Sequence, residues 1–137
     1  MTTSELCQPY LDAVLAADRA QVEAATDAAL RRSLDPLEVY EQVYAPALHE
    51  VGLRWERAEL SVTAEHIATA LTEAEMTRLL PYLLAGVRVG RSAVVASVEG
   101  EQHRVGARMV ADCFESMGWD GAFVGLDRYL SRFEASL

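Results

Sequence analysis

Apolar residues recur at the three- and four-residue spacing of an amphipathic helix in four successive segments between residues 3 and 84. The four stripes are Leu6, Tyr10, Val14 and Ala17; Val22, Ala25, Ala29 and Leu30; Leu37, Tyr40, Tyr44, Leu48, Val51 and Trp55; and Ile67, Leu71, Ala74, Leu79 and Leu83. Helices joined by short connections pack as antiparallel neighbours. The pattern therefore predicts an N-terminal four-helix bundle.

A residue with a capping side chain precedes each predicted helix. In chain order these residues are Ser4, Asp18, Asp35 and either Ser61 or Thr63. Pro46 lies inside the third predicted helix, where its missing N–H predicts a local kink.

The apolar pattern changes after a predicted linker at residues 86–90. Ser92–Val98 is a continuous apolar run, which is typical of a strand buried on both faces of a parallel sheet. A helical pattern over Arg104–Met117 ends at Gly118, and Gly121–Gly125 predicts a second strand. The order strand–helix–strand predicts a right-handed βαβ unit, so the chain is expected to be α/β overall. A short helix is expected from Asp127.

Charge and composition exclude several classes of function. The net charge of −9 repels a phosphate backbone, so direct binding to nucleic acid is not expected. No apolar run approaches the roughly 20 residues of a membrane helix, and the N-terminus lacks the layout of a signal peptide. The two cysteines, Cys7 and Cys113, have no metal-binding spacing, which predicts a reducing cytoplasm.

The strongest chemical candidate lies between the first strand and the helix that follows it. His103 at this edge offers an imidazole nitrogen, a common ligand for transition metals. Glu101 could orient the ring, and Gly106 leaves room for a bulky group at the first turn of the helix. Taken alone, a loop histidine such as His103 is more often an ordinary surface residue than a metal ligand.

Two motifs together narrow this interpretation. Glu101, His103 and Gly106 form a Glu-x-His-x-x-Gly pattern that resembles the cobalamin-binding domain. Trp55 is followed, after nine residues, by Glu65-His66, which is similar to the Trp-x9-Glu-His signature of the CarH-type adenosylcobalamin photoreceptor family.

The resemblance implies a helical cobalamin cap over residues 1–85 and a partial, flavodoxin-like cobalamin-binding α/β domain over residues 86–137. It implies that His103 is the lower axial ligand of cobalt. It places Trp55 over the upper face of the corrin ring, with Glu65 and His66 as hydrogen-bonding partners of the adenosyl group. From periodicity alone, Trp55 could simply belong to the interior of the bundle.

The sequence departs from the family pattern at several points. Glu56 follows Trp55, where the best-known photoreceptors have a histidine that ligates cobalt after illumination. The DNA-binding domain and the second half of the cobalamin-binding sheet are expected to be absent. A sheet of two parallel strands leaves unpaired edges, which predicts a homo-oligomer or another partner that covers them.

The leading hypothesis is a non-enzymatic cobalamin-binding sensor, responsive to light, that acts through its own assembly or through a regulatory protein partner. Adenosylcobalamin is the favoured cofactor, and methylcobalamin is the alternative. A corrinoid carrier of a methyltransferase system and a cofactor-free interaction module are the other hypotheses.

Overall fold

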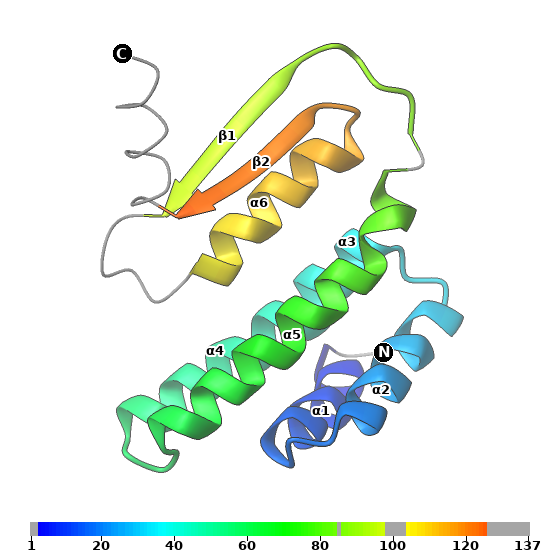
Figure 1. Ribbon diagram of the computed structural model, residues 1–137. Helices are drawn as coiled ribbons and strands as arrows, with labels where there is room; N and C mark the ends of the chain where they lie inside the picture. Colours follow the sequence, from blue (N-terminus) through cyan, green and yellow to red (C-terminus); the bar gives the residue numbers. More distant parts are fainter. Residues whose placement is uncertain (1–2, 85, 98–103, 126–137) are drawn as a thin grey trace. The chain divides into compact units, whose positions relative to one another are not determined.

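The computed structural model describes residues 3–84, 86–97 and 104–125, which form two compact units, Met1–Leu79 and Leu80–Leu137 (Figure 1). The elements are α1 (Thr3–Leu15), α2 (Arg19–Arg31), α3 (Pro36–Val39), the π-helical η1 (Tyr40–Tyr44), α4 (Ala45–Glu56), α5 (Val62–Leu83), β1 (Ser92–Ser97), α6 (Arg104–Ser116) and β2 (Asp120–Gly125).

The described part of the chain is mostly helical and has a small parallel sheet, so the predicted order of helices followed by strand–helix–strand is confirmed. The short helix predicted from Asp127 lies outside the described residues. Within the described ranges, no helix is long and apolar enough to cross a membrane.

Side-chain caps start three of the helices in the first unit. The backbone N–H three positions further along donates to Asp18 (3.1 Å), Asp35 (3.0 Å) and Ser61 (3.0 Å). Ser61, rather than Thr63, therefore caps α5. The prediction for Ser4 was wrong, because α1 begins one residue earlier and Ser4 lies within its first turn.

Pro46 alters the hydrogen-bond pattern of the third predicted helix. Proline has no N–H, so the carbonyl group four residues earlier loses its usual donor. Over η1 the backbone widens, and the N–H of Ala45 donates to the carbonyl of Tyr40, five residues back. The irregularity predicted at Pro46 thus takes the form of a π-helical segment, and α3, η1 and α4 form one continuous stretch.

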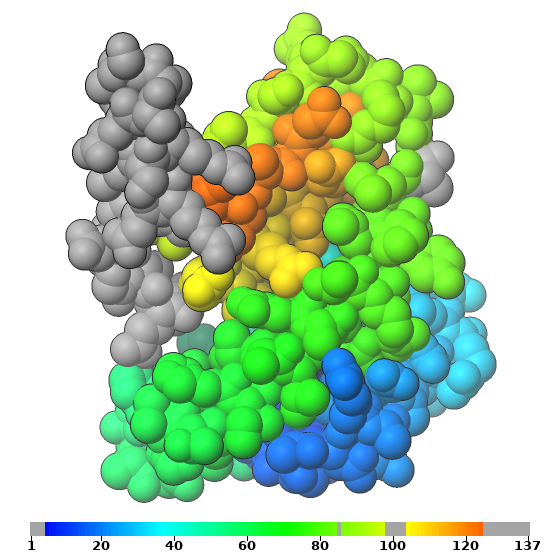
Figure 2. All heavy atoms as spheres, in the orientation of Figure 1, coloured from blue at the N-terminus to red at the C-terminus, as the bar shows by residue number. Residues whose placement is uncertain are grey.

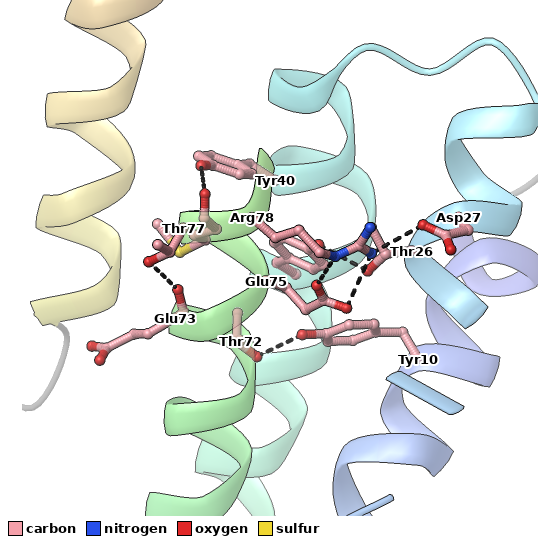
Figure 3. A network of polar contacts seen from close by, with 11 residues as sticks. Tyr10, Thr26, Asp27, Tyr40, Thr72, Glu73, Glu75, Thr77 and Arg78 are labelled. Atoms are coloured by element: carbon pink, nitrogen blue, oxygen red, sulfur yellow. Dashed lines mark hydrogen bonds and ion pairs between the residues drawn. The ribbon is translucent and has the colours of Figure 1, made fainter. Parts of the chain in front are cut away.

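Hydroxyl pairs join the helices inside the first unit (Figure 3). Tyr10 of α1 and Thr72 of α5 are hydrogen-bonded at 2.8 Å, and Thr26 of α2 bonds Tyr44 of η1 at the same distance. The rings of Tyr10 and Tyr44 are 4.8 Å apart between centroids. Burial raises the pKa of both phenols, so they stay protonated and can donate.

A buried carboxylate adds an ion-pair chain to this network. The side chain of Glu75 is only 4% exposed, and its oxygens accept from Arg78 at 2.7 and 3.3 Å. Arg78 also donates to Asp27 of α2 at 3.0 Å, which links α5 to α2 (Figure 3). A buried charge is costly unless it is paired, and Arg78 of the same helix supplies that pairing, while its contact with Asp27 adds a partly exposed link to α2.

The buried face of α5 agrees with the predicted one at Leu79 and Leu83 and differs from it nearer the start of the helix. Ile67 is 39% exposed, and Leu71 and Ala74 are half-buried. The face that is buried carries Ala68, Thr72, Glu75, Met76 and Leu79. The prediction failed there because two buried positions are polar: Thr72 bonds Tyr10 of α1, and Glu75 is paired with Arg78 of the same helix.

The second unit contains two parallel strands with α6 against them (Figure 1). The register pairs Ser92 with Asp120 and Ser97 with Gly125. Burial alternates along β1, and Val94 is 59% exposed. The prediction of a strand buried on both faces is therefore wrong for the described residues, because α6 covers only one face.

The segment predicted as a linker, residues 86–90, is fixed by hydrogen bonds to the end of α6 and the start of β2. The guanidinium of Arg88 donates to the carboxylates of Glu115 (2.7 Å) and Asp120 (3.1 Å) and to the carbonyl oxygens of Glu115 and Trp119. The other oxygen of the Glu115 carboxylate accepts from the N–H of Gly121 at 2.9 Å. Arg88 therefore joins the end of α6 to the start of β2.

Gly118 ends α6, as predicted, and its backbone has a φ of +89°. A Cβ atom at this position would lie 2.2 Å from the carbonyl oxygen of Val87. Both the conformation and the space therefore require glycine.

We expect Thr72→Val to lower the free energy of unfolding more than Tyr10→Phe. Thr72 Oγ1 uses its only hydrogen to donate to the carbonyl of Ala68 at 2.9 Å, so Tyr10 is the donor in their shared bond. Valine would leave a buried phenol without an acceptor, at a cost of about 1–3 kcal/mol, whereas phenylalanine would cost about 1 kcal/mol. Urea unfolding followed by circular dichroism measures both; equal losses would contradict this assignment.

We expect Gly118→Ala to destabilise the second unit by at least about 2 kcal/mol, because of its φ and its contact with Val87. Ala17→Gly tests the reverse change, in which glycine replaces a residue with a positive φ, because Ala17 has a φ of 54° at the end of α1. That change should stabilise the chain by up to about 1 kcal/mol. Hydrogen exchange of the β1 and β2 amides tests the first variant, and urea unfolding tests the second; a well-tolerated Gly118→Ala would refute the steric argument.

Candidate functional site

The structure describes some of the predicted site residues and leaves others outside its range. Those it describes are Trp55, Glu65, His66 and Gly106. Glu101 and His103 lie outside the described residues. The first three belong to the helical unit and Gly106 belongs to the second unit, so each group is described within its own unit.

The turn between α4 and α5 carries Trp55 at one end and Glu65-His66 shortly after the other. Glu59 N–H donates to the carbonyl of Arg54 at 2.8 Å, and Ala58 N–H donates to that of Trp55 at 3.0 Å. Ala58 has a φ of 59°, so the end of α4 has the hydrogen bonds of a Schellman motif without a glycine. These bonds fix the backbone on both sides of the tryptophan.

Two arginines reinforce the end of α4. Glu50 accepts from Arg54 at 3.0 Å and from Arg57 at 3.5 Å. All three side chains are about a third to a half exposed, so each pair contributes little to stability. Their effect is to hold the last turn of α4 and the first residue of the loop together.

Trp55 is half-buried, whereas Val51, one turn earlier on α4, is 1% exposed. Part of the indole is therefore available to a ligand while the rest packs on the protein. An aromatic ring in this position can contribute apolar contact area to a flat ligand without losing its own support.

Glu65 and His66 form an ordered pair in the first turns of α5. His66 Nδ1 lies 2.6 Å from one oxygen of the Glu65 carboxylate, and Thr69 Oγ1 donates to the other at 3.3 Å. The carboxylate is 18% exposed, whereas the imidazole is 75% exposed. Glu65 thus accepts one hydrogen bond from Thr69 and lies at ion-pair distance from His66, whose side chain is mostly exposed.

Thr69 is a residue that the sequence interpretation missed. It lies four positions after Glu65, which is the spacing at which two side chains on a helix meet. That spacing was the available signal.

Other polar residues near the turn are less organised. Glu56, at the position after Trp55, is exposed, and so is His49 on α4. The thiols of Cys7 and Cys113 have a raised pKa, mainly because of burial, so they are poor nucleophiles. In the described ranges, no cluster of three or more His, Cys, Asp or Glu residues could hold a metal ion.

A cavity of about 250 Å³ lies between α2 and α5. Its lining is Arg19, Val22, Glu23, Leu71, Ala74, Glu75, Thr77 and Arg78. This volume is below the roughly 300–1,000 Å³ of small-molecule sites, and the lining contains no predicted site residue. The cavity is therefore separate from the candidate site.

The described residues fit cobalamin at two points. Gly106 is exposed on the first turn of α6, and a Cβ atom there would meet nothing within 4 Å. The chain itself therefore does not require this glycine for packing, and the open space suits a bulky ligand. In the helical unit, half-buried Trp55 leaves part of an aromatic surface that could contact a flat ring such as the corrin.

The family model and the similar proteins all indicate a domain that binds vitamin B12 or a related corrinoid. A family model described as "B12 binding domain" matches residues 6–80. The dimethylamine corrinoid protein of Methanosarcina barkeri is 30% identical over 136 residues, which cover 97% of this chain and 63% of that protein. Dimethylamine corrinoid protein 1 of Methanosarcina acetivorans is 28% identical over 135 residues, with the same coverage.

The HTH-type transcriptional repressor CarH of Myxococcus xanthus is 34% identical over 99 residues, which cover 72% of this chain and 32% of the repressor. The chain thus spans 63% of the length of the corrinoid proteins and about a third of the repressor. The matching family model describes a binding domain, and the two Methanosarcina relatives are named as corrinoid proteins, which agrees with the prediction that this chain is not an enzyme. Because the family model covers more than half of the sequence, the chain belongs to the B12-binding domain family, and its cofactor is cobalamin.

Proposed function

We propose that this chain is a light-responsive cobalamin sensor whose helical unit recognises the upper ligand of the cofactor. Its helices would form a four-helix cap over residues 1–85. Trp55 would cover the upper face of the corrin ring, and Glu65 and His66 would bond the polar groups of an adenosyl ligand. Adenosylcobalamin is the favoured form of the cofactor.

The observation that carries this proposal is the Glu65–His66 pair, ordered by Thr69 and separated from Trp55 only by the α4–α5 turn. Covering the cofactor needs only an apolar surface. An ordered carboxylate and imidazole provide hydrogen-bonding capacity beyond that surface, as a ligand with hydroxyl groups requires. A methyl upper ligand would leave these groups unused.

The second unit would bind the other side of the cofactor. Residues 86–137 would serve as a partial, flavodoxin-like cobalamin-binding domain. His103 would ligate cobalt from below, Glu101 would orient its ring, and Gly106 would leave space for the approach. The open surroundings of Gly106 support this role.

Bound adenosylcobalamin would supply the chromophore and a cobalt–carbon bond that light can break. The residues of this chain would bind and orient the cofactor and limit access of water to its upper face. A signal would then pass through assembly or through a regulatory protein partner, in the cytoplasm. The net charge of −9 disfavours nucleic acid as the direct target.

A corrinoid carrier that works with a methyltransferase is the second candidate. The similarity to the dimethylamine corrinoid proteins extends over 97% of this chain. Glu56 also favours it, because the position lacks the histidine that photoreceptors of this kind use. Recognition of the upper ligand distinguishes the two candidates.

We expect the chain to retain adenosylcobalamin in preference to methylcobalamin in the dark, and the bound spectrum to change on illumination. Trp55→Ala should reduce the preference for the adenosyl form by about tenfold, or ~1.4 kcal/mol, because the aromatic cover is lost. Visible absorption after desalting measures both effects. His49→Ala, an exposed change on the same helix, is the control.

Equal retention of the two forms, with no response to light, would favour the carrier. A chain that stays colourless with both forms would contradict both candidates and leave a cofactor-free interaction module.

We expect His103→Ala to shift the spectrum of bound cobalamin toward the base-off form and to weaken binding by at least about tenfold, because the axial nitrogen is removed. Helicity measured by circular dichroism should be unchanged. If the wild type binds and the two spectra coincide, the assignment of His103 as axial ligand is wrong.

A further inference from the structure

The cavity between α2 and α5 has a charged side and an apolar side. Val22, which lines it, is 1% exposed, and Leu71 and Ala74 of α5 are half-buried. Arg19 and Glu23, four positions apart on α2, also line it and are exposed. A molecule that enters the cavity therefore meets charged groups on the solvent side and apolar surface on the protein side.

The two charged residues of α2 keep their hydrogen-bonding capacity. In the described part of the chain, neither Arg19 nor Glu23 forms a side-chain hydrogen bond or an ion pair. Arginine presents N–H donors in a planar fork that matches a carboxylate, and the Glu23 carboxylate can only accept. The cavity thus offers one unused cation and one unused carboxylate on the same helix.

Arg78 adds further donors from α5. Its Nε and Nη2 atoms donate to the carboxylates of Glu75 and Asp27 (Figure 3), whereas Nη1 has no partner among the described residues. Both oxygens of buried Glu75 already accept from this guanidinium. The two N–H groups of Nη1 are therefore available to another acceptor.

The charges of the lining favour one class of ligand. The lining contains two arginines and two glutamates. A simple anion would lie beside both carboxylates, and a simple cation would lie beside both guanidinium groups, and each such contact between like charges is costly. A zwitterion avoids both costs, because its carboxylate can face the arginines while its ammonium group faces Glu23.

The size of the cavity narrows the class further. A volume of about 250 Å³ holds about eight water-sized groups at ~30 Å³ each. Valine and leucine are molecules of this size, whereas tryptophan is much larger. The apolar wall formed by Val22, Leu71 and Ala74 suits a branched aliphatic side chain.

We propose that this cavity binds a small apolar zwitterion, namely a free branched-chain α-amino acid. Arg19 and Arg78 hold its carboxylate, Glu23 holds its ammonium group, and its side chain packs on the apolar wall. The bound molecule bridges α2 and α5, and it stabilises the helical unit by mass action. This site is separate from the cobalamin site and does not depend on the proposed function.

The first test titrates the cobalamin-free chain with leucine and follows the backbone amide signals by NMR. We expect saturable shifts at the lining residues, with a dissociation constant at least about tenfold lower than for N-acetylleucine or isopentylamine. N-acetylleucine lacks the cation, and isopentylamine lacks the carboxylate. If leucine shifts no lining amide, there is no such site; if either analogue binds equally well, the zwitterion assignment is wrong.

The second test removes the charges of α2 one at a time. Arg19→Gln and Glu23→Gln should each raise the dissociation constant for leucine by about tenfold, because each removes a charge-assisted contact. Arg31→Gln is the matched control, since Arg31 is an exposed arginine in the last turn of α2, outside the lining. Equal dissociation constants in the three variants and the wild type would overturn the assigned contacts.

The third test fills the cavity. Ala74→Leu adds apolar volume to the lining, whereas Ala70→Leu makes the same change at an exposed position of α5 outside it. We expect the first variant to lose leucine binding and the second to bind as the wild type does. Circular dichroism checks that both keep their helices. A folded Ala74→Leu chain with unchanged affinity for leucine would show that the cavity is not the site.

Retention of adenosylcobalamin by the same variants distinguishes this site from the proposed function. The lining contains none of the residues proposed to contact the cofactor, so we expect Ala74→Leu to retain cobalamin as the wild type does. A chain that binds leucine and retains no cobalamin would support this inference while the proposed function fails. Loss of cobalamin together with leucine in Ala74→Leu, with the helices intact, would overturn the assignment of a separate site.

Discussion

The buried charge of Glu75 is the constraint on which the helical unit depends. A carboxylate with 4% exposure must be paired, and Arg78 is the residue that pairs with it. Arg78 lies on the same helix and also donates to Asp27, so one arginine both pairs the buried carboxylate and links α5 to α2. Neutral hydroxyl pairs, such as the one between Tyr10 and Thr72, add directional contacts to the same interface. Burial of apolar surface alone would tolerate rotation or sliding of α5, whereas these partners do not.

In the second unit, one arginine on the surface links neighbouring elements in a similar way. Arg88 contacts two carboxylates and two carbonyl groups where α6 ends and β2 begins. Close backbone approaches at Gly118 and Gly121 leave no room for a Cβ atom. A sheet of two strands has little apolar area with which to define its geometry, so specific polar contacts and glycine contacts define it instead.

The candidate site depends on the first of these constraints. Because α5 is fixed, its N-terminal turns hold Glu65, His66 and Thr69 at a definite rotation, with the carboxylate inward and the imidazole outward. The α4–α5 turn then sets the position of Trp55 through backbone bonds rather than through burial. A sensor of the upper ligand needs such preorganised groups, since flexible ones would lose affinity to ordering on binding.

The sequence by itself determined what depends on neighbours along the chain. Helical spacing, the Asp18 and Asp35 caps and the stop at Gly118 are local, and so is the Trp55-to-Glu65 motif that indicated cobalamin. The tertiary structure decided which face of α5 is buried, because a polar residue such as Thr72 favours burial only when a partner from a distant segment reaches it. It also decided that, within the described part of the second unit, α6 covers only one face of β1. Periodicity registers apolar faces and carries no information on a partner 62 residues away, such as the one that Thr72 finds in Tyr10.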